Sequence, residues 1–112
     1  MLNDKSSALL ENLIAVELSR EYGEIYYMKS AKTGIDVDFY VPELRWAIQV
    51  AYSVKGEARD REIGGLLKLA DKFPEVQRLT VVTWDEQESV ASGRLPIEVM
   101  PAYRFLLSEM RS

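Results

Sequence analysis

The 112-residue sequence contains neither cysteine nor histidine. Their absence excludes a thiolate nucleophile, a Ser–His or Cys–His catalytic pair and any ordinary structural zinc site. Chemistry in this chain would have to depend on carboxylates, lysine, arginine, tyrosine or a hard, oxygen-seeking metal ion such as Mg²⁺.

Long apolar runs are also missing, and the longest are far shorter than the ~20 residues that cross a bilayer. The segment Met1–Lys5 lacks the basic stretch and apolar core of a signal peptide. No G-x-x-x-x-G-K-[ST] phosphate-binding run occurs. We therefore predict a cytoplasmic protein with no membrane partner and no P-loop of its own.

Positive charge is in short supply. The formal net charge is −4 and the isoelectric point about 4.9, so any contact with nucleic acid would need a local basic patch. The candidate patch consists of Lys29, Lys32, Lys55, Arg59 and Arg61. With 47% apolar residues and no repeat or linker, residues 1–112 are predicted to form one domain with a buried core.

Hydrophobic periodicity predicts the element order α-β-β-β-α-β-β-α. The predicted helices cover 6–22, 61–73 and a segment opened by Pro101, and the predicted strands cover 24–29, 35–41, 46–52, 78–84 and 96–100. Residues 85–94 are expected to be an acidic loop. Three consecutive strands predict an antiparallel meander, and the helix that follows predicts a crossover to a parallel strand. The fold class is therefore α/β, a mixed sheet sandwiched by helices.

Several polar residues depart from this apolar pattern. Glu11 and Glu17 lie on or beside the apolar face of the first helix, where a carboxylate must be paired, solvated or bound to a ligand. Asp36 and Asp38 share one face of a strand, which suits either a solvated surface or a divalent metal. Gln49 interrupts an apolar strand, and because buried amides are hydrogen-bonded it needs a partner, with Asp38 as the candidate.

Four segments together resemble a known family. They are Glu11-Asn12-Leu13-Ile14, Asp36-Val37-Asp38-Phe39, residues 48–53 and the closing stretch 101–107. In order and spacing they look like a C-terminal domain of unknown function that follows the ATPase module of archaeal and bacterial AAA-type proteins. That domain is similar to the PD-(D/E)XK, or restriction-endonuclease-like, fold, which includes archaeal Holliday-junction resolvases. The chain is then either a fragment of such an ATPase or a free-standing copy.

The resemblance implies a set of site residues. Glu11 matches the helix glutamate of active nucleases, Asp38 the strand aspartate and Gln49 the second acid, while Ala51 occupies the lysine position. An active site of this kind would hold Mg²⁺ or Mn²⁺ on Glu11, Asp36 and Asp38 and cut DNA. The missing lysine predicts a degenerate site, unless Lys55, or else Arg61 or Lys68, supplies the cation.

The alternative is a non-catalytic domain that binds a P-loop ATPase module, another protein or a second copy of itself. Trp46, Trp84 and Tyr103 are candidate anchors, although the two tryptophans fit a core position better. An exposed strand edge is a further route to self-association. The direction of Lys55 separates the two hypotheses, since a lysine that faces Glu11 and Asp38 favours catalysis.

Overall fold

The computed structural model describes residues 2–30, 35–91 and 93–110, and the side chains of residues 7–27, 37–91 and 93–108. The α-helices are α1 (Leu2–Glu21), α2 (Ala58–Lys72) and α3 (Ala102–Met110), and a short 3₁₀ helix, η1, covers Pro42–Leu44. The strands are β1 (Tyr26–Ser30), β2 (Ile35–Val41), β3 (Trp46–Val50), β4 (Arg78–Thr83), β5 (Glu88–Val90) and β6 (Ile97–Pro101). The turn predicted for 31–34 lies outside the described residues.

The strands form one mixed sheet in the order β1-β2-β3-β4-β6-β5. β1, β2 and β3 are antiparallel neighbours, while β3, β4 and β6 are parallel. The predicted meander and parallel crossover are therefore confirmed. The expectation of a continuous loop over 85–94 is wrong, because Glu88–Val90 pairs antiparallel with β6 and forms an edge of the sheet.

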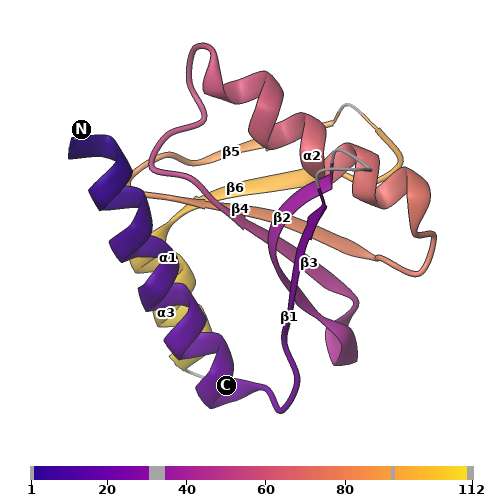
Figure 1. The fold of residues 1–112 in the computed structure, drawn as a ribbon, viewed down its shortest axis with the longest axis horizontal. Helices are drawn as coiled ribbons and strands as arrows, with labels where there is room; N and C mark the ends of the chain where they lie inside the picture. Colours follow the sequence, from indigo (N-terminus) through magenta and orange to yellow (C-terminus); the bar gives the residue numbers. More distant parts are fainter. Residues whose placement is uncertain (1, 31–34, 92, 111–112) are drawn as a thin grey trace.

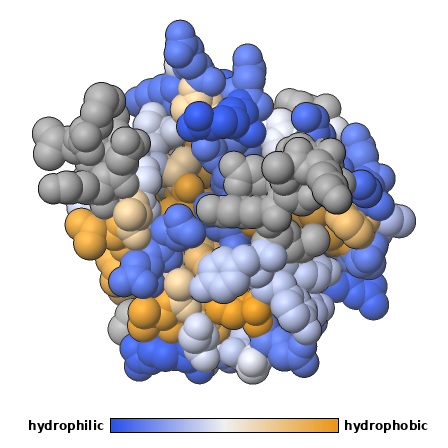
Figure 2. All heavy atoms as spheres, viewed as in Figure 1, coloured by the Kyte–Doolittle hydropathy of each residue, from blue (hydrophilic) through white to orange (hydrophobic). Residues whose placement is uncertain are grey.

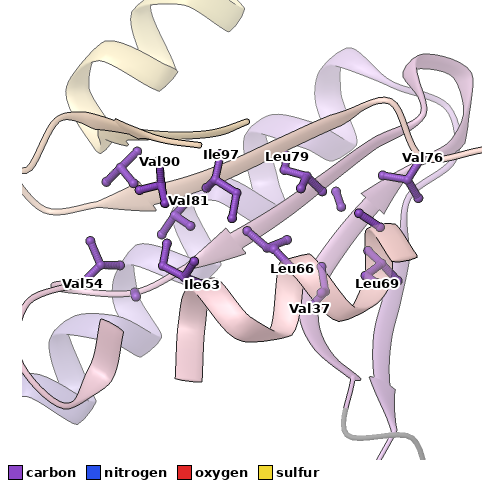
Figure 3. Close-up of a cluster of buried hydrophobic side chains, with 14 residues drawn as sticks. Val37, Val54, Ile63, Leu66, Leu69, Val76, Leu79, Val81, Val90 and Ile97 are labelled. Carbon is purple, nitrogen blue, oxygen red and sulfur yellow. The ribbon is translucent and has the colours of Figure 1, made fainter. Parts of the chain in front are cut away.

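Helices cover both faces of the sheet (Figure 1). α2 lies across one face, where its Ile63, Leu66 and Leu69 meet Val81 and Ile97 of the strands (Figure 3). α1 and α3 lie side by side on the opposite face. Apolar burial on both faces explains why β3 is buried along its whole length, as its nearly continuous apolar sequence predicted.

Two helices begin earlier than their apolar periodicity predicts. α1 starts at Leu2, and α2 starts at Ala58, so Gly64 and Gly65 both lie inside α2. Gly65 is buried, which favours close packing as the reason for a residue that otherwise weakens a helix. In α1 the buried Glu17 forms an ion pair with Arg20 one turn later, at 3.7 Å.

A bulge in β2 changes which way its side chains point. Tyr26 pairs with Tyr40, but Met28 pairs with Val37, so β2 carries one extra residue between these pairs. As a result Val37 packs in the core beneath α2, whereas Phe39 packs in the core beneath α1. Regular alternation along 35–41 predicts that Val37 and Phe39 share one face, and this expectation is wrong because of the bulge.

The two tryptophans have opposite environments. Trp46 is fully buried, donates a 2.8 Å hydrogen bond from Nε1 to Thr80 Oγ1 and packs its ring against Phe105. Trp84 was expected in the core, yet it is 56% exposed, because it follows the last residue of β4 and leaves the sheet. No helix in the described part of the chain is both long and apolar enough to cross a membrane.

Candidate functional site

The site begins where two neighbouring strands separate. β2 and β3 pair from Val41–Trp46 to Phe39–Ile48. One further step would pair Asp38 with Gln49, but the backbone ladder ends there. β3 continues on its other side, where Gln49 and Val50 still pair with β4. The β1–β2 hairpin therefore leaves β3 at Asp38, and backbone N–H groups on the facing edges need new acceptors.

Asp38 and Gln49 satisfy those groups with their side chains. The Asp38 N–H donates to Gln49 Oε1 at 2.9 Å, and the Val50 N–H donates to Asp38 Oδ2 at 2.8 Å. Both residues are buried. The predicted contact between Gln49 and Asp38 is confirmed, although the atom that Gln49 contacts is the backbone nitrogen rather than the carboxylate. Each side chain thus replaces a missing backbone acceptor.

α2 adds a second carboxylate to the arrangement. Gln49 Nε2 donates a short hydrogen bond to Glu62 Oε2, and the Arg61 Nε donates to Glu62 Oε1 at 3.3 Å. Glu62 is buried. We call these contacts the Asp38–Gln49–Glu62 network. Both polar atoms of the Gln49 side chain, Oε1 and Nε2, are hydrogen-bonded. Each carboxylate oxygen of Glu62 accepts a hydrogen bond.

Glu11 and Ala51, two further predicted residues, lie in different surroundings. Glu11 is half-buried on the α1 side of the sheet, beside a surface hollow of about 450 Å³ that Tyr27 and Phe39 also line. Ala51 is buried in the core beneath α2. The side chain of Asp36 lies outside the described residues, so its place in a metal site stays a prediction.

An open cleft adjoins the network at the carboxyl end of β3. It has a volume of about 480 Å³, and its lining includes Ser7, Ser53, Lys55, Arg61 and Glu62, together with Val50 at the end of β3. Lys55 is solvent-exposed. Lys55 and Glu62 share this cleft, whereas Asp38 and Glu11 are not among its lining residues. A lysine that faces Glu11 and Asp38 would favour catalysis. Because Lys55 is exposed and does not share its cleft with those two residues, its placement favours the non-catalytic hypothesis.

The described acidic side chains do not cluster in the way that a divalent metal site requires. Mg²⁺ prefers several oxygen ligands around one point. Among the side chains that the structure describes, no three acidic groups converge in a way that could hold a metal ion.

The predicted basic rim is partly neutralised. Arg59 NH1 and NH2 each donate a 2.8 Å hydrogen bond to the carboxylate of Glu88. Arg61 is paired with Glu62, and the side chains of Lys29 and Lys32 lie outside the described residues. Of the three rim residues whose side chains are described, Arg59 and Arg61 contact carboxylates. The side chain of Lys55 is not bonded to one.

The Arg59–Glu88 pair gives a pH-dependent prediction. Hydrogen bonds from Arg59 lower the pKa of Glu88 below its ordinary value, and the charges of Arg59 and Lys55 add to the effect. A lowered pKa means that the pair stabilises the fold above the ordinary glutamate pKa and loses this effect as the pH falls through the folded-state value. In Arg59→Ala we expect the pKa of Glu88 to rise, as measured by NMR titration of its side-chain carboxyl carbon.

Arg59→Lys is the matched variant, because it keeps the charge and loses the paired hydrogen bonds. We expect it to give a pKa for Glu88 between those of the original chain and Arg59→Ala. An unchanged pKa in Arg59→Ala would contradict the contact.

The sequence analysis did not identify Glu62, the third member of the network. Its position nevertheless indicated burial, because Glu62, Leu66 and Leu69 follow one stripe of α2 at spacings of four and three residues. An acid on a buried stripe requires a partner, and Gln49 is that partner. The chain matches no protein-family model, no curated protein and no solved structure.

Proposed function

We propose that the chain is a non-catalytic domain built on a nuclease-like scaffold, and that it acts by binding a protein rather than by cutting DNA. The resemblance to domains that follow an ATPase module suggests such a module, or another protein, as its partner. The restriction-endonuclease-like identity of the fold is part of this proposal, with the meander β1–β2–β3 and the crossover through α2 in its support.

One observation carries the proposal. The side chains at the strand aspartate and second-acid positions, Asp38 and Gln49, accept hydrogen bonds from backbone groups that would otherwise lack them. One oxygen of each side chain is therefore engaged by a backbone group of the sheet. Loss of either side chain should therefore damage the fold more than it damages any chemistry.

The surroundings of these two residues support the same conclusion. Ala51 cannot carry the charge or transfer the proton that the family's lysine provides. Lys55 is exposed at the rim of the cleft, and Arg61 is bonded to Glu62.

A cleavage assay with Asp38→Asn tests the proposal. Asparagine keeps an oxygen that can accept the Val50 N–H, so the variant should fold, but it removes the negative charge that a metal requires. We expect neither protein to cut branched, duplex or single-stranded DNA in Mg²⁺ or Mn²⁺, beside an active nuclease as positive control. Cleavage by the original chain that disappears in Asp38→Asn would overturn the proposal.

A second candidate function is the binding of nucleic acid at the cleft between Ser7 and α2. The cleft lies beyond the carboxyl end of β3, the end at which open α/β sheets commonly bind ligands. Lys55 and Arg61 line it. If phosphates bind there, affinity for DNA should fall with added salt and in Lys55→Ala. Fluorescence anisotropy measures both effects.

A further inference from the structure

Part of the sheet face opposite α2 is exposed and carries polar side chains. Along β6, Ile97 and Val99 pack in the core beneath α2, so Glu98 between them points to the opposite face, where it is exposed. Ser89 of β5 pairs with Glu98 and is exposed beside it on that face. Apolar side chains gather on the surface along α1 (Figure 2), whereas β5 and β6 present polar ones here.

This polar region is hollowed, and two arginines line the hollow. Its volume is about 530 Å³, which lies within the range of about 300–1,000 Å³ that is usual for small-molecule sites. A polar lining suits a hydrophilic ligand. The polar side chains that concern us are Arg78 of β4, Arg104 of α3, Glu98 of β6, and Gln87 and Ser89 at the sheet edge.

The hollow has an excess of positive charge, although the chain as a whole carries a net charge of −4. Arg78 and Arg104 face one free-standing acid, Glu98. Glu88 also belongs to the lining, but its carboxylate accepts two 2.8 Å hydrogen bonds from Arg59 and is neutralised by it. A local surplus of positive charge favours a negatively charged ligand.

Arg78 is held in place by contacts that leave most of its donors available. Its Cζ lies 4.1 Å from the centroid of the Trp46 ring, and Trp46 is itself fully buried and bonded to Thr80. Within the described residues, the side chain of Arg78 makes one hydrogen bond, from NH2 to Glu98 Oε1 at 3.4 Å. A guanidinium carries five N–H donors. A cation that is organised before its ligand arrives loses less conformational entropy on binding.

Arg104 supplies the second guanidinium, from the first turn of α3. The backbone there is anchored, because the next residue, Phe105, is buried with its ring against Trp46. The side chain of Arg104 is exposed, and among the residues that the structure describes it has no hydrogen-bond or ion-pair partner. One hollow is thus lined by a guanidinium fixed on the sheet and by a second one whose donors are unused.

We propose that this hollow binds an oxyanion, the carboxylate or phosphate group of a small molecule, between Arg78 and Arg104. Guanidinium groups bind both kinds of anion through paired, charge-assisted hydrogen bonds. The Gln87 amide and the Ser89 hydroxyl add uncharged donors. The site lies on the sheet face opposite α2 and uses no residue of the Asp38–Gln49–Glu62 network, so it stands or falls independently of the proposed function.

Glu98 limits the affinity of the site. Its ion pair with Arg78 is long, at 3.4 Å, and both side chains are about half exposed. Exposed pairs of this kind are weak, so an anionic ligand can displace Glu98 from Arg78. The displaced carboxylate still repels the ligand. Removal of this acid and removal of a lining arginine should therefore change the affinity in opposite directions.

Titration of the full chain with sodium phosphate, followed in ¹H–¹⁵N spectra at constant ionic strength, tests the proposal. We expect saturable shifts of the Gln87, Ser89 and Arg104 amides. A parallel titration with sodium succinate, a dicarboxylate, shows which of the two groups the site prefers. Arg104→Gln should raise the dissociation constant about 10-fold or more, because it removes charge-assisted hydrogen bonds. Glu98→Gln should lower it about threefold.

Two control variants change the net charge of the chain outside the hollow. Arg20→Gln is matched to Arg104→Gln, because Arg20 is an exposed arginine of α1, and Asp71→Asn is matched to Glu98→Gln, because Asp71 is an exposed acid of α2. Both should leave the dissociation constant unchanged. All four altered residues are exposed, so the far-ultraviolet circular dichroism should be unchanged. Absence of saturable shifts with either anion, or equal weakening by Arg104→Gln and Arg20→Gln, would overturn the proposal.

Discussion

Gln49→Ala is expected to lower the free energy of unfolding by about 2–4 kcal/mol, because each buried polar group left without a partner costs about 1–3 kcal/mol. The substitution removes the acceptor of the Asp38 N–H and the donor to Glu62 in one step. Urea denaturation followed by circular dichroism measures the change. Gln87→Ala is the control, since Gln87 is exposed, and it should change the stability by less than about 0.5 kcal/mol.

Gln49→Glu tests the same contacts, because it introduces the acid that the proposed resemblance to nuclease-like domains would place at this position. In the network it would replace an N–H donor by a second carboxylate beside Glu62. Such a like-charge pair raises the pKa of one carboxyl, so the loss of stability should be large at neutral pH and shrink as the pH falls. A variant as stable as the original chain at neutral pH would contradict the network.

Trp46→Ala is expected to cost about 3–5 kcal/mol, the usual range for removing a buried aromatic side chain. Trp46 has no accessible surface, and its ring also lies beneath the Arg78 guanidinium, whose Cζ is 4.1 Å from the ring centroid. The stability of a small domain is only about 5–15 kcal/mol, so we expect Trp46→Ala to be close to unfolded at physiological temperature. Thermal unfolding followed by circular dichroism measures this loss.

Two comparisons locate the origin of that effect. Trp46→Phe keeps most of the packing but leaves the buried Thr80 hydroxyl without its Nε1–H donor, so it should cost about 1–3 kcal/mol. Tyr103→Ala removes an aromatic ring that is largely exposed and should have little effect. A loss of less than about 1 kcal/mol in Trp46→Ala would contradict the packing described for this residue.

The sequence was sufficient to predict the arrangement of the central strands. Alternation in 35–41 and the continuous apolar run that begins at Trp46 correctly predicted β2 and the fully buried β3. The helix before Arg78 correctly predicted a parallel crossover. These features depend on burial, which the order of apolar residues records directly.

Features that depend on contacts between distant residues could not be predicted in the same way. β5 has three residues, and Glu88 and Ser89 are exposed, so no apolar pattern predicts this strand. It is a strand through its antiparallel pairing with the edge of β6. The bulge in β2 reverses the expected direction of Val37 relative to Phe39. Trp84 has the composition of a core residue but follows the end of its strand.

The candidate site shows the same division. The sequence identified Gln49 as a residue in need of a partner, with Asp38 as the candidate, and the structure brings the two together. It did not reveal that their partners are backbone groups, because the point at which β2 leaves β3 is a property of the assembled sheet. Glu62 shares a stripe of α2 with Leu66 and Leu69, so the sequence indicated that it needs a partner, but it did not indicate that this partner is Gln49.

The most direct test of the account is whether Asp38 and Gln49 serve the sheet or a metal. We would record ¹H–¹⁵N spectra of the full chain during titration with Mn²⁺, a paramagnetic ion that broadens the signals of nearby amides. If the Asp38–Gln49–Glu62 network is structural, the amide signals of Asp38, Val50 and Glu62 should broaden no more than those of residues elsewhere on the surface. Selective broadening of these three signals, abolished in Asp38→Asn, would contradict the account and identify a metal site.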